Sequence, residues 1–360
     1  MISFARGAPA PECLDSELLA DCARAAVAGD ASVLAYGAGG GYAPLREWLG
    51  ARHGVDAARV ILTSGGLQGF VFYAEELLAE RPGHVLVEAP TYDRPLRILA
   101  RLGAEVVPVA MDGEGLDPDA LERELGAGEA SFLYTIPTFQ NPSGRTLSAE
   151  RRRRVVELAR EHGVPVLEDD PYGLVRYEGE PPPSLHELEG GDLVTYASSF
   201  SKTIAPGLRV GSLVAPANLA ARLEARAVSN YISPPFISQA TVLELIDRGA
   251  FEPNLERIKG LLRTRRDAMR DALARDLAGA ATWSEPEGGY FLWVDLPVDA
   301  AELLRRAEAA GVTFVKGADF YPSTYAGGAG GSGSARLAFS FASPSEIADG
   351  VSTLAGLLRA

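Results

Sequence analysis

Short apolar runs alternate with helix-like segments through the middle of the chain. Seven such runs occur, at residues 60–64, 84–90, 105–111, 131–137, 164–170, 192–199 and 208–216. Between them apolar residues recur with the period of an amphipathic helix, as in residues 66–80. Alternation of this kind is typical of right-handed βαβ units, in which helices cover both faces of a mostly parallel sheet. We therefore predict an α/β fold whose large domain is built on a mostly parallel, seven-stranded sheet.

The pattern changes after about residue 250, where a long charged helix is followed by short strand-like runs and two further helices. We predict a smaller α+β C-terminal domain at residues 250–360, beside a large ligand-binding domain at residues 31–249. Residues 1–30 are expected to form an N-terminal arm and a helix that pack with the small domain. The glycine-rich segment 326–334 has the composition of a flexible loop.

Charge and cysteine content narrow the class of protein. The 360 residues include 34 Lys or Arg and 48 Asp or Glu, which gives a formal net charge of −14. Such a balance disfavours nucleic acid as a partner, because phosphate binding requires a basic surface. No apolar run reaches membrane-spanning length, and no signal peptide is recognisable. Cys13 and Cys22 are too few for a disulfide framework and are expected to be ordinary buried side chains. We predict a cytoplasmic protein without a membrane partner.

Polar residues and glycines follow the predicted strands at the points where the strands end. In parallel sheets, ligands bind beyond these carboxyl ends. The residues concerned are Gly65, Gly66, Leu67 and Gln68 after the first strand, Asn141 to Gly144 after the fourth, Asp169, Asp170 and Tyr172 around the end of the fifth, Ser198, Ser199, Ser201 and Lys202 around the end of the sixth, and Arg209 at the start of the seventh. We expect them to meet at one edge of the sheet and to face one ligand.

The chemical types of these residues indicate which ligand they bind. Amides at a glycine-rich helix start, serine hydroxyls and Arg209 can together hold a phosphate. Lys202 lies in an apolar setting, which lowers the pKa of its amine and leaves it free to attack a carbonyl. An aspartate can hold a protonated ring nitrogen, and an asparagine and a tyrosine can bond a phenolate oxygen. A phosphate, an aldehyde, a basic ring nitrogen and a phenolate together describe pyridoxal 5′-phosphate, PLP.

Nearly the whole chain resembles the fold-type-I, PLP-dependent aminotransferases of class I/II, of the kynurenine/2-aminoadipate aminotransferase type. The matching segments occur in order along the chain: ISFARGAPAPE, YGAGGGYAPLREWL, TSGGLQGF, EAPTYDRPL, YTIPTFQNPSGRTLS, LEDDPYGLVRYEG, SSFSKTIAPGLRVG, EGGYFLWVDLP and RLAFSF. Each segment alone is a weak signal, whereas their order and spacing together are specific. The resemblance implies a transaminase of the EC 2.6.1 type that acts in amino-acid metabolism with PLP as its cofactor.

The resemblance also implies a role for each matching residue around the coenzyme. Lys202 would form the Schiff base and carry the proton between the substrate Cα and C4′ of the coenzyme. Asp169 would keep the pyridine nitrogen protonated, and the adjacent Asp170 is the alternative for this role. Tyr172 and Asn141 would bond O3′ of the ring. The other coenzyme contacts would come from Tyr92 on the ring face and, at the phosphate, from Ser199, Ser201, Arg209 and the amides of Gly66 and Leu67.

Substrate binding and assembly are implied in the same way. Arg336 matches the arginine that clamps the substrate α-carboxylate, and Asn141 and Gly7 match residues beside the substrate. A structural ion pair is the alternative for Arg336. Tyr36 matches the tyrosine that reaches the phosphate from the partner subunit, so the resemblance implies a homodimer with shared active sites. Simple packing is the alternative for Tyr36. The four histidines lack metal-ligand spacing, and no metal site is predicted.

One departure from the family bears on the phosphate site. Relatives often have a hydroxyl residue and a glutamine where this chain has Gly66 and Leu67, so only backbone amides remain there. The resemblance implies ping-pong transfer of an amino group between an L-amino acid and a 2-oxo acid, with glutamate and 2-oxoglutarate as the shared pair. The alternative is elimination, cyclisation or oxidation at Cα, Cβ or Cγ in specialised biosynthesis. A non-catalytic PLP sensor domain, as some transcriptional regulators carry, is disfavoured because the catalytic set is complete.

Overall fold

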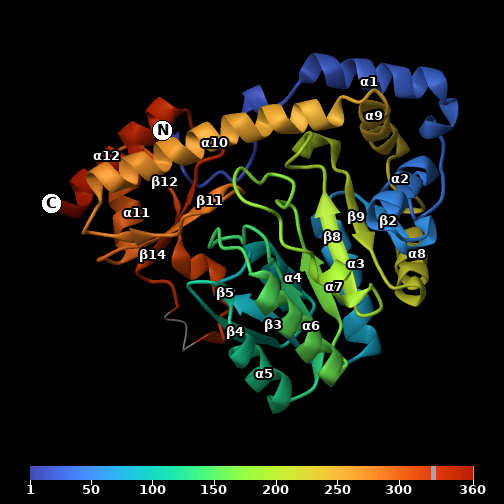
Figure 1. Cartoon of the computed structure of the whole chain (residues 1–360), viewed down its shortest axis with the longest axis horizontal. Helices are drawn as coiled ribbons and strands as arrows, with labels where there is room; N and C mark the ends of the chain where they lie inside the picture. Colours follow the sequence, from blue (N-terminus) through green and yellow to red (C-terminus); the bar gives the residue numbers. More distant parts are fainter. Residues whose placement is uncertain (326–329, 360) are drawn as a thin grey trace.

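The computed structural model describes residues 1–325 and 330–359 (Figure 1). Its large sheet contains the seven predicted strands, and a two-residue strand adds an eighth at one edge. The strands are β2 (Val60–Thr63), β3 (His84–Ala89), β4 (Val106–Asp112), β5 (Gly115–Leu116), β6 (Ala130–Thr135), β7 (Val166–Asp169), β8 (Val194–Ser199) and β9 (Gly211–Val214). Their order is β2-β9-β8-β7-β6-β3-β4-β5, with β8, β7, β6, β3 and β4 parallel to one another. The mostly parallel sheet is thus confirmed.

Helices cover both faces of this sheet, as the alternating pattern predicts. One face packs on α3 (Gly66–Glu80), α4 (Asp93–Arg101) and α8 (Ala217–Tyr231). The other face packs on α5 (Pro118–Ala127), α6 (Ala149–His162) and α7 (Leu185–Glu189), which lie in front of the sheet in Figure 1. Burial on both faces explains why the consecutive residues Val85, Leu86 and Val87 of β3 are all apolar. Polar groups therefore gather where the strands end.

A run of four arginines predicts a solvated helix face, but residues 151–154, which form part of α6, do not form one throughout. Arg152 is 1% exposed. Its guanidinium donates to the carbonyls of Leu147 and Pro137 and to the hydroxyl of Thr138, and it lies 3.6 Å from the buried Glu168. A charged group can be buried when its donors are satisfied in this way. Arg152 thereby fixes the loop that follows β6.

The C-terminal part forms a second core, beside the large sheet. A small antiparallel sheet has the order β10-β11-β14-β13. It packs with the C-terminal half of the long helix α10 and with two further helices. The elements are α10 (Phe251–Asp276), β10 (Thr282–Trp283), β11 (Phe291–Asp295), α11 (Ala300–Ala309), β13 (Val315–Lys316), β14 (Ser334–Ala338) and α12 (Pro344–Arg359). The segment predicted as a flexible loop includes residues 326–329, which lie outside the described residues.

The first thirty residues divide between the two cores. Strand β1 (Ile2–Ser3) pairs in parallel with β12 (Val312–Thr313), and Phe4 is fully buried in the small core. Helix α1 (Ser16–Gly29) instead lies along α9 (Phe236–Asp247), close to α2 (Ala43–His53) (Figure 1). The arm therefore packs on the small core, whereas α1 contacts elements within residues 31–249. The division of the chain at residues 30 and 249 stays a prediction.

Both cysteines are free and buried, as expected from the sequence. Burial raises the pKa of the thiols of Cys13 and Cys22, which disfavours the reactive thiolate form. No helix among residues 1–325 and 330–359 combines the length and the apolar character needed to cross a membrane.

Candidate active site

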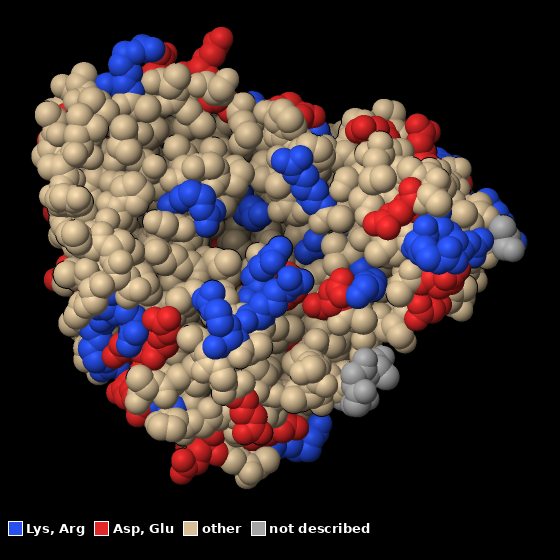
Figure 2. Space-filling model, turned by 180° about the vertical axis from the view of Figure 1, so that it is seen from behind, with Lys and Arg blue, Asp and Glu red and all other residues tan. Residues whose placement is uncertain are grey.

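A cavity of about 360 Å³ opens at the carboxyl edge of the large sheet. The face turned away from the viewer in Figure 1 is hollowed near its middle, and Lys and Arg side chains gather around the hollow (Figure 2). The lining of the cavity includes every residue to which the resemblance assigns a contact with the coenzyme or the substrate, except Tyr36: Gly7, Gly66, Leu67, Tyr92, Asn141, Asp169, Tyr172, Ser199, Ser201, Lys202, Arg209 and Arg336. Of the other residues expected at the strand ends, Gly65, Gln68, Ser198 and residues 142–144 do not line it. Residues from segments far apart in the sequence thus meet in one place.

Lys202 lies just beyond the end of β8, in the turn that leads to β9. Its Nζ donates a hydrogen bond of 2.8 Å to the carbonyl of Gly7 and lies 5.1 Å from the centre of the Tyr290 ring. Burial, with the charges of Arg336 and Arg209, lowers the pKa of the Lys202 amine to about 8. An amine with this pKa is partly neutral near pH 7, and only the neutral form attacks a carbonyl carbon.

Two adjacent carboxylates at the end of β7 face different cavities. Asp169 lines the active-site cavity, and its Oδ2 accepts a hydrogen bond of 2.8 Å from the Tyr134 hydroxyl. Asp170 lines a second cavity, where its carboxylate accepts from the Tyr196 hydroxyl and from the amide of Gly173. Successive residues of a strand point to opposite faces, which explains the separation. Asp169, rather than Asp170, is therefore placed to meet a ligand in the active-site cavity.

The start of α3 forms an anion-binding corner with Arg209. Gly65 has φ of 83°, and a Cβ there would lie only 2.2 Å from Nη2 of Arg209. Glycine is thus required for the guanidinium to approach the helix start. A Cβ on Gly66 would meet nothing closer than 3.8 Å, and Ser199 lies next to it. The first amides of a helix have no partner inside it, so those of Gly66 and Leu67 are available to a phosphate.

Arg336, on β14, adds a second positively charged guanidinium to the lining of the cavity, from the small sheet. Its Nη1 donates 2.9 Å to the side-chain oxygen of Asn141, and its Nη2 donates 2.8 Å to the carbonyl of Ala5. The guanidinium stacks on Phe291, 4.2 Å from the ring centre, and its buried Nε has no partner among the described residues. Within the described part of the chain, no carboxylate lies within ion-pair distance of Arg336. The structure therefore does not favour a structural ion pair.

Comparison with known proteins identifies the family to which this chain belongs. Residues 10–348 match the family model for aminotransferases of class I and II. The chain is 32% identical to aromatic-amino-acid aminotransferase 1 of Thermococcus litoralis, over 100% of this chain and 88% of that protein. It is 34% identical to 2-aminoadipate transaminase of Thermus thermophilus, over 100% of this chain and 90% of that protein. The chain belongs to the class I and II aminotransferase family.

A solved structure supports the same assignment. The alpha-aminoadipate aminotransferase LysN of Thermus thermophilus, complexed with N-(5′-phosphopyridoxyl)-L-leucine, superposes with a TM-score of 0.93 at 34% identity. The match covers 100% of this chain and 92% of that one. The protein is thus a PLP-dependent aminotransferase of fold type I, which transfers amino groups between amino acids and 2-oxo acids. The cavity fits PLP, because one wall offers a phosphate corner, another a carboxylate and a third an amine.

The aminotransferase has further residues at the cavity that the sequence did not single out. Tyr134, Phe70, Phe291 and the pair Asp93–Arg94 contact the predicted site residues or line the cavity. Tyr134 and Phe70 lie in apolar runs and look like ordinary core residues in the sequence. Phe291 limits the space beside Gly7, because a Cβ on Gly7 would lie 2.6 Å from its ring. This contact is the structural reason for a glycine at position 7.

Tyr36 is the one predicted site residue that lies away from the cavity. Its side chain is 83% exposed, and Leu34 beside it is 65% exposed. Three more exposed apolar residues, Val228, Ile232 and Ile237, lie on α8, at its end and on α9. Glycines of the 37–40 loop, which follows Tyr36, approach Val228 and Phe236, so these segments adjoin one another. We call Leu34, Tyr36, Val228, Ile232 and Ile237 the apolar face.

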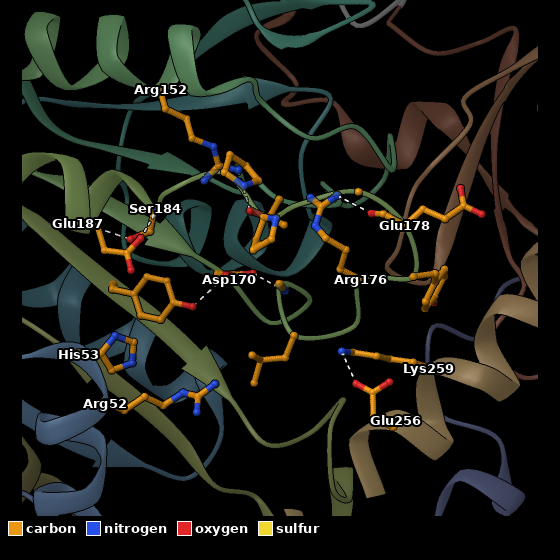
Figure 3. Close-up of a pocket in the computed structure, with 18 of the residues that line it drawn as sticks. Arg52, His53, Arg152, Asp170, Arg176, Glu178, Ser184, Glu187, Glu256 and Lys259 are labelled. Atoms are coloured by element: carbon orange, nitrogen blue, oxygen red, sulfur yellow. Dashed lines mark hydrogen bonds and ion pairs between the residues drawn. The ribbon is translucent and has the colours of Figure 1, made fainter. Parts of the chain in front are cut away.

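The second cavity, of about 900 Å³, lies between the loop after β7, the end of α2 and α10 (Figure 3). Its basic residues already have acidic partners, such as Lys259 with Glu256 at 2.8 Å and Arg263 with Glu178 at 3.6 Å. Asp170 forms part of its wall and, through Tyr196 and the Gly173 amide, fixes the start of the loop that carries Tyr172. Asp170 and its partners in the wall of the second cavity therefore support the loop that carries Tyr172.

The pKa of Lys202 predicts how coenzyme uptake depends on pH. Because only a neutral amine reacts with an aldehyde, a coenzyme that bonds to Lys202 should be incorporated into coenzyme-free protein at a rate that rises with pH and levels off above about 8. Stopped-flow absorbance at pH 6 to 11 measures this rate. In Arg336→Gln the midpoint should move upward, because the Arg336 charge lowers this pKa. A rate that keeps rising to the ordinary lysine pKa of 10.5 would contradict the proposed environment of Lys202.

Proposed function

We propose that Lys202 is the coenzyme-binding lysine and the proton carrier of this transaminase. The observation that carries the proposal is the meeting, in one cavity, of a lysine with a lowered pKa, the Asp169 carboxylate and the Arg336 guanidinium with its free Nε. When bound, PLP supplies an electron sink for the pair of electrons released at the substrate Cα. Lys202 Nζ would accept the proton from this Cα, and the Gly7 carbonyl would hold the amine in place.

The other predicted residues would orient the coenzyme and the substrate. Asp169 would bind the ring nitrogen, and Tyr172 and Asn141 would bond O3′. Arg336 would bind the substrate α-carboxylate, because two of its nitrogens are held by Asn141 and Ala5 while Nε is free to donate. Tyr92 would stack on the ring, and Gly7 would contact the substrate. The phosphate would be held by Ser199, Ser201, Arg209 and the amides of Gly66 and Leu67.

We propose glutamate and 2-oxoglutarate as one substrate pair. The cavity lining has four basic side chains, Arg94, Lys202, Arg209 and Arg336, against two acidic ones, Asp93 and Asp169. This balance favours anionic ligands in a chain whose net charge is −14. The relatives are named for aromatic amino acids and 2-aminoadipate, which supports a second substrate from one of these classes.

We further propose that the protein is a cytoplasmic homodimer with shared active sites. The apolar face supports dimerisation, because contiguous exposed apolar residues of this kind mark association surfaces. Tyr36 lies within this face and would reach the phosphate of the partner's active site. The two free cysteines support a reducing compartment.

Replacing Arg336 tests the substrate clamp. In Arg336→Gln we expect KM for amino acids to rise about a hundredfold with little change in coenzyme absorption, because a charge-assisted contact to the α-carboxylate is lost. Steady-state kinetics and an absorption spectrum of the holoenzyme measure the two effects. Arg94→Gln is the matched control: it removes the same charge from the cavity lining but should change KM for a monocarboxylic donor less than threefold. An unchanged KM in Arg336→Gln would place the clamp elsewhere.

A charge on the apolar face tests the dimer. Light scattering should give the wild type twice the chain mass of 38.0 kDa, and Leu34→Asp should halve the mass and abolish most activity. Val298→Asp is the control, because Val298 is also an exposed apolar residue, 37% exposed, but lies in the small domain. A wild type that is fully active at 38.0 kDa would refute both the dimer and the role of Tyr36.

A further inference from the structure

Tyr134 is a fully buried tyrosine whose hydroxyl reaches the end of the neighbouring strand. It lies on β6, next to β7, and its ring packs edge-on against Phe70, with centroids 5.1 Å apart. Its hydroxyl donates a hydrogen bond of 2.8 Å to Oδ2 of Asp169. Most buried tyrosine hydroxyls have a hydrogen-bond partner, and here the partner is the carboxylate proposed to meet the ring nitrogen.

This contact leaves the other oxygen of Asp169 for the coenzyme. Oδ1 makes no hydrogen bond within residues 1–325 and 330–359, and Asp169 lines the active-site cavity. Tyr134 therefore fixes the carboxylate through one oxygen and leaves the second oxygen available to a ligand. Two rotatable bonds set the orientation of an aspartate carboxylate, and a hydrogen bond to one oxygen restricts both of them.

The charges around Asp169 work against its ionisation. Burial raises the pKa of this carboxyl to about 7, and the nearby carboxyls of Asp170 and Glu88 contribute to the rise. No Lys or Arg pairs with Asp169 among the described residues. The hydrogen bond from Tyr134 is the contact that lowers the pKa of Asp169. Hydrogen bonds to a charged acceptor are about twice as strong as neutral ones, so this single donor matters.

We propose that Tyr134 is a positioning residue for catalysis: its hydroxyl holds the negative charge on Asp169 and thereby keeps the shared proton on the ring nitrogen of the coenzyme. The inference rests on the proposed role of Asp169. With the coenzyme bound, one proton would be shared between the carboxylate and the ring nitrogen, and it would stay on the nitrogen only while the carboxylate is the weaker base. Without the Tyr134 hydroxyl the carboxylate becomes the stronger base and the proton moves to it.

Removing the hydroxyl tests this directly. In Tyr134→Phe, the NMR signal of the ring nitrogen of ¹⁵N-labelled PLP in the holoenzyme should shift from the range of a protonated pyridine to that of a neutral one. The rate of the half-reaction with an amino acid should fall about tenfold while KM changes little. Tyr73→Phe is the matched control, because Tyr73 is equally buried in the same core and, among the described residues, its hydroxyl makes no hydrogen bond to a residue that lines the cavity. Its spectrum and rate should equal those of the wild type.

A second variant keeps the test valid if Tyr134→Phe does not fold. Tyr134→3-fluorotyrosine keeps the ring and the hydroxyl but makes the hydroxyl a stronger donor, so the nitrogen should become more fully protonated. Identical nitrogen shifts in the wild type and in every Tyr134 variant that folds would overturn the inference while leaving the proposed function intact. A neutral nitrogen in the wild type itself would overturn both the inference and the role of Asp169.

Discussion

Five parallel strands end at one edge of the large sheet, and the positions of these ends determine where most side chains of the site lie. Because β3, β6, β7 and β8 are buried on both faces, their strand residues supply little chemistry to solvent. The chain gains access to a ligand at the last residues of these strands, such as Asp169 and Ser199, and in the loops that follow, which carry Tyr92, Asn141, Tyr172 and Lys202. Helices on both faces hold the strands in register and thereby set the distances between these side chains.

Burial then determines what these groups can do. It lowers the pKa of Lys202 to about 8 and of Arg336 to about 10, and it raises that of Asp169 to about 7. The amine gains reactivity, and the guanidinium stays charged because even the lowered pKa lies well above neutral pH. The carboxylate would lose its charge without a donor such as Tyr134. The same apolar surroundings thus favour the reactive neutral form of Lys202 and disfavour the charged form of Asp169. A hydrogen bond to the Asp169 carboxylate offsets this effect of burial.

Much of the site could be predicted because glycine, proline and charged residues follow the apolar strands at the points where the strands end. Lys202 and Arg209 stand out in the sequence, and twelve of the thirteen predicted site residues line one cavity. Tyr134 escaped prediction because a strand buried on both faces gives no alternation that distinguishes a tyrosine with a functional hydroxyl from a core aromatic. Arg152 was misjudged because four arginines in a row on a helix cannot all face solvent. Tyr36 lies on the apolar face and away from the cavity, so its predicted contact with the phosphate depends on the proposed dimer.

The central claim is that Lys202 and its neighbours carry out transamination. The most direct measurement mixes purified holoenzyme with single amino acids, L-glutamate first, without any 2-oxo acid, and follows coenzyme absorption and products. The account predicts conversion to pyridoxamine 5′-phosphate with one 2-oxo acid released per active site, and no conversion in Lys202→Ala. Repeated release of ammonia without pyridoxamine 5′-phosphate would contradict it, and would show that this fold performs elimination, cyclisation or oxidation instead.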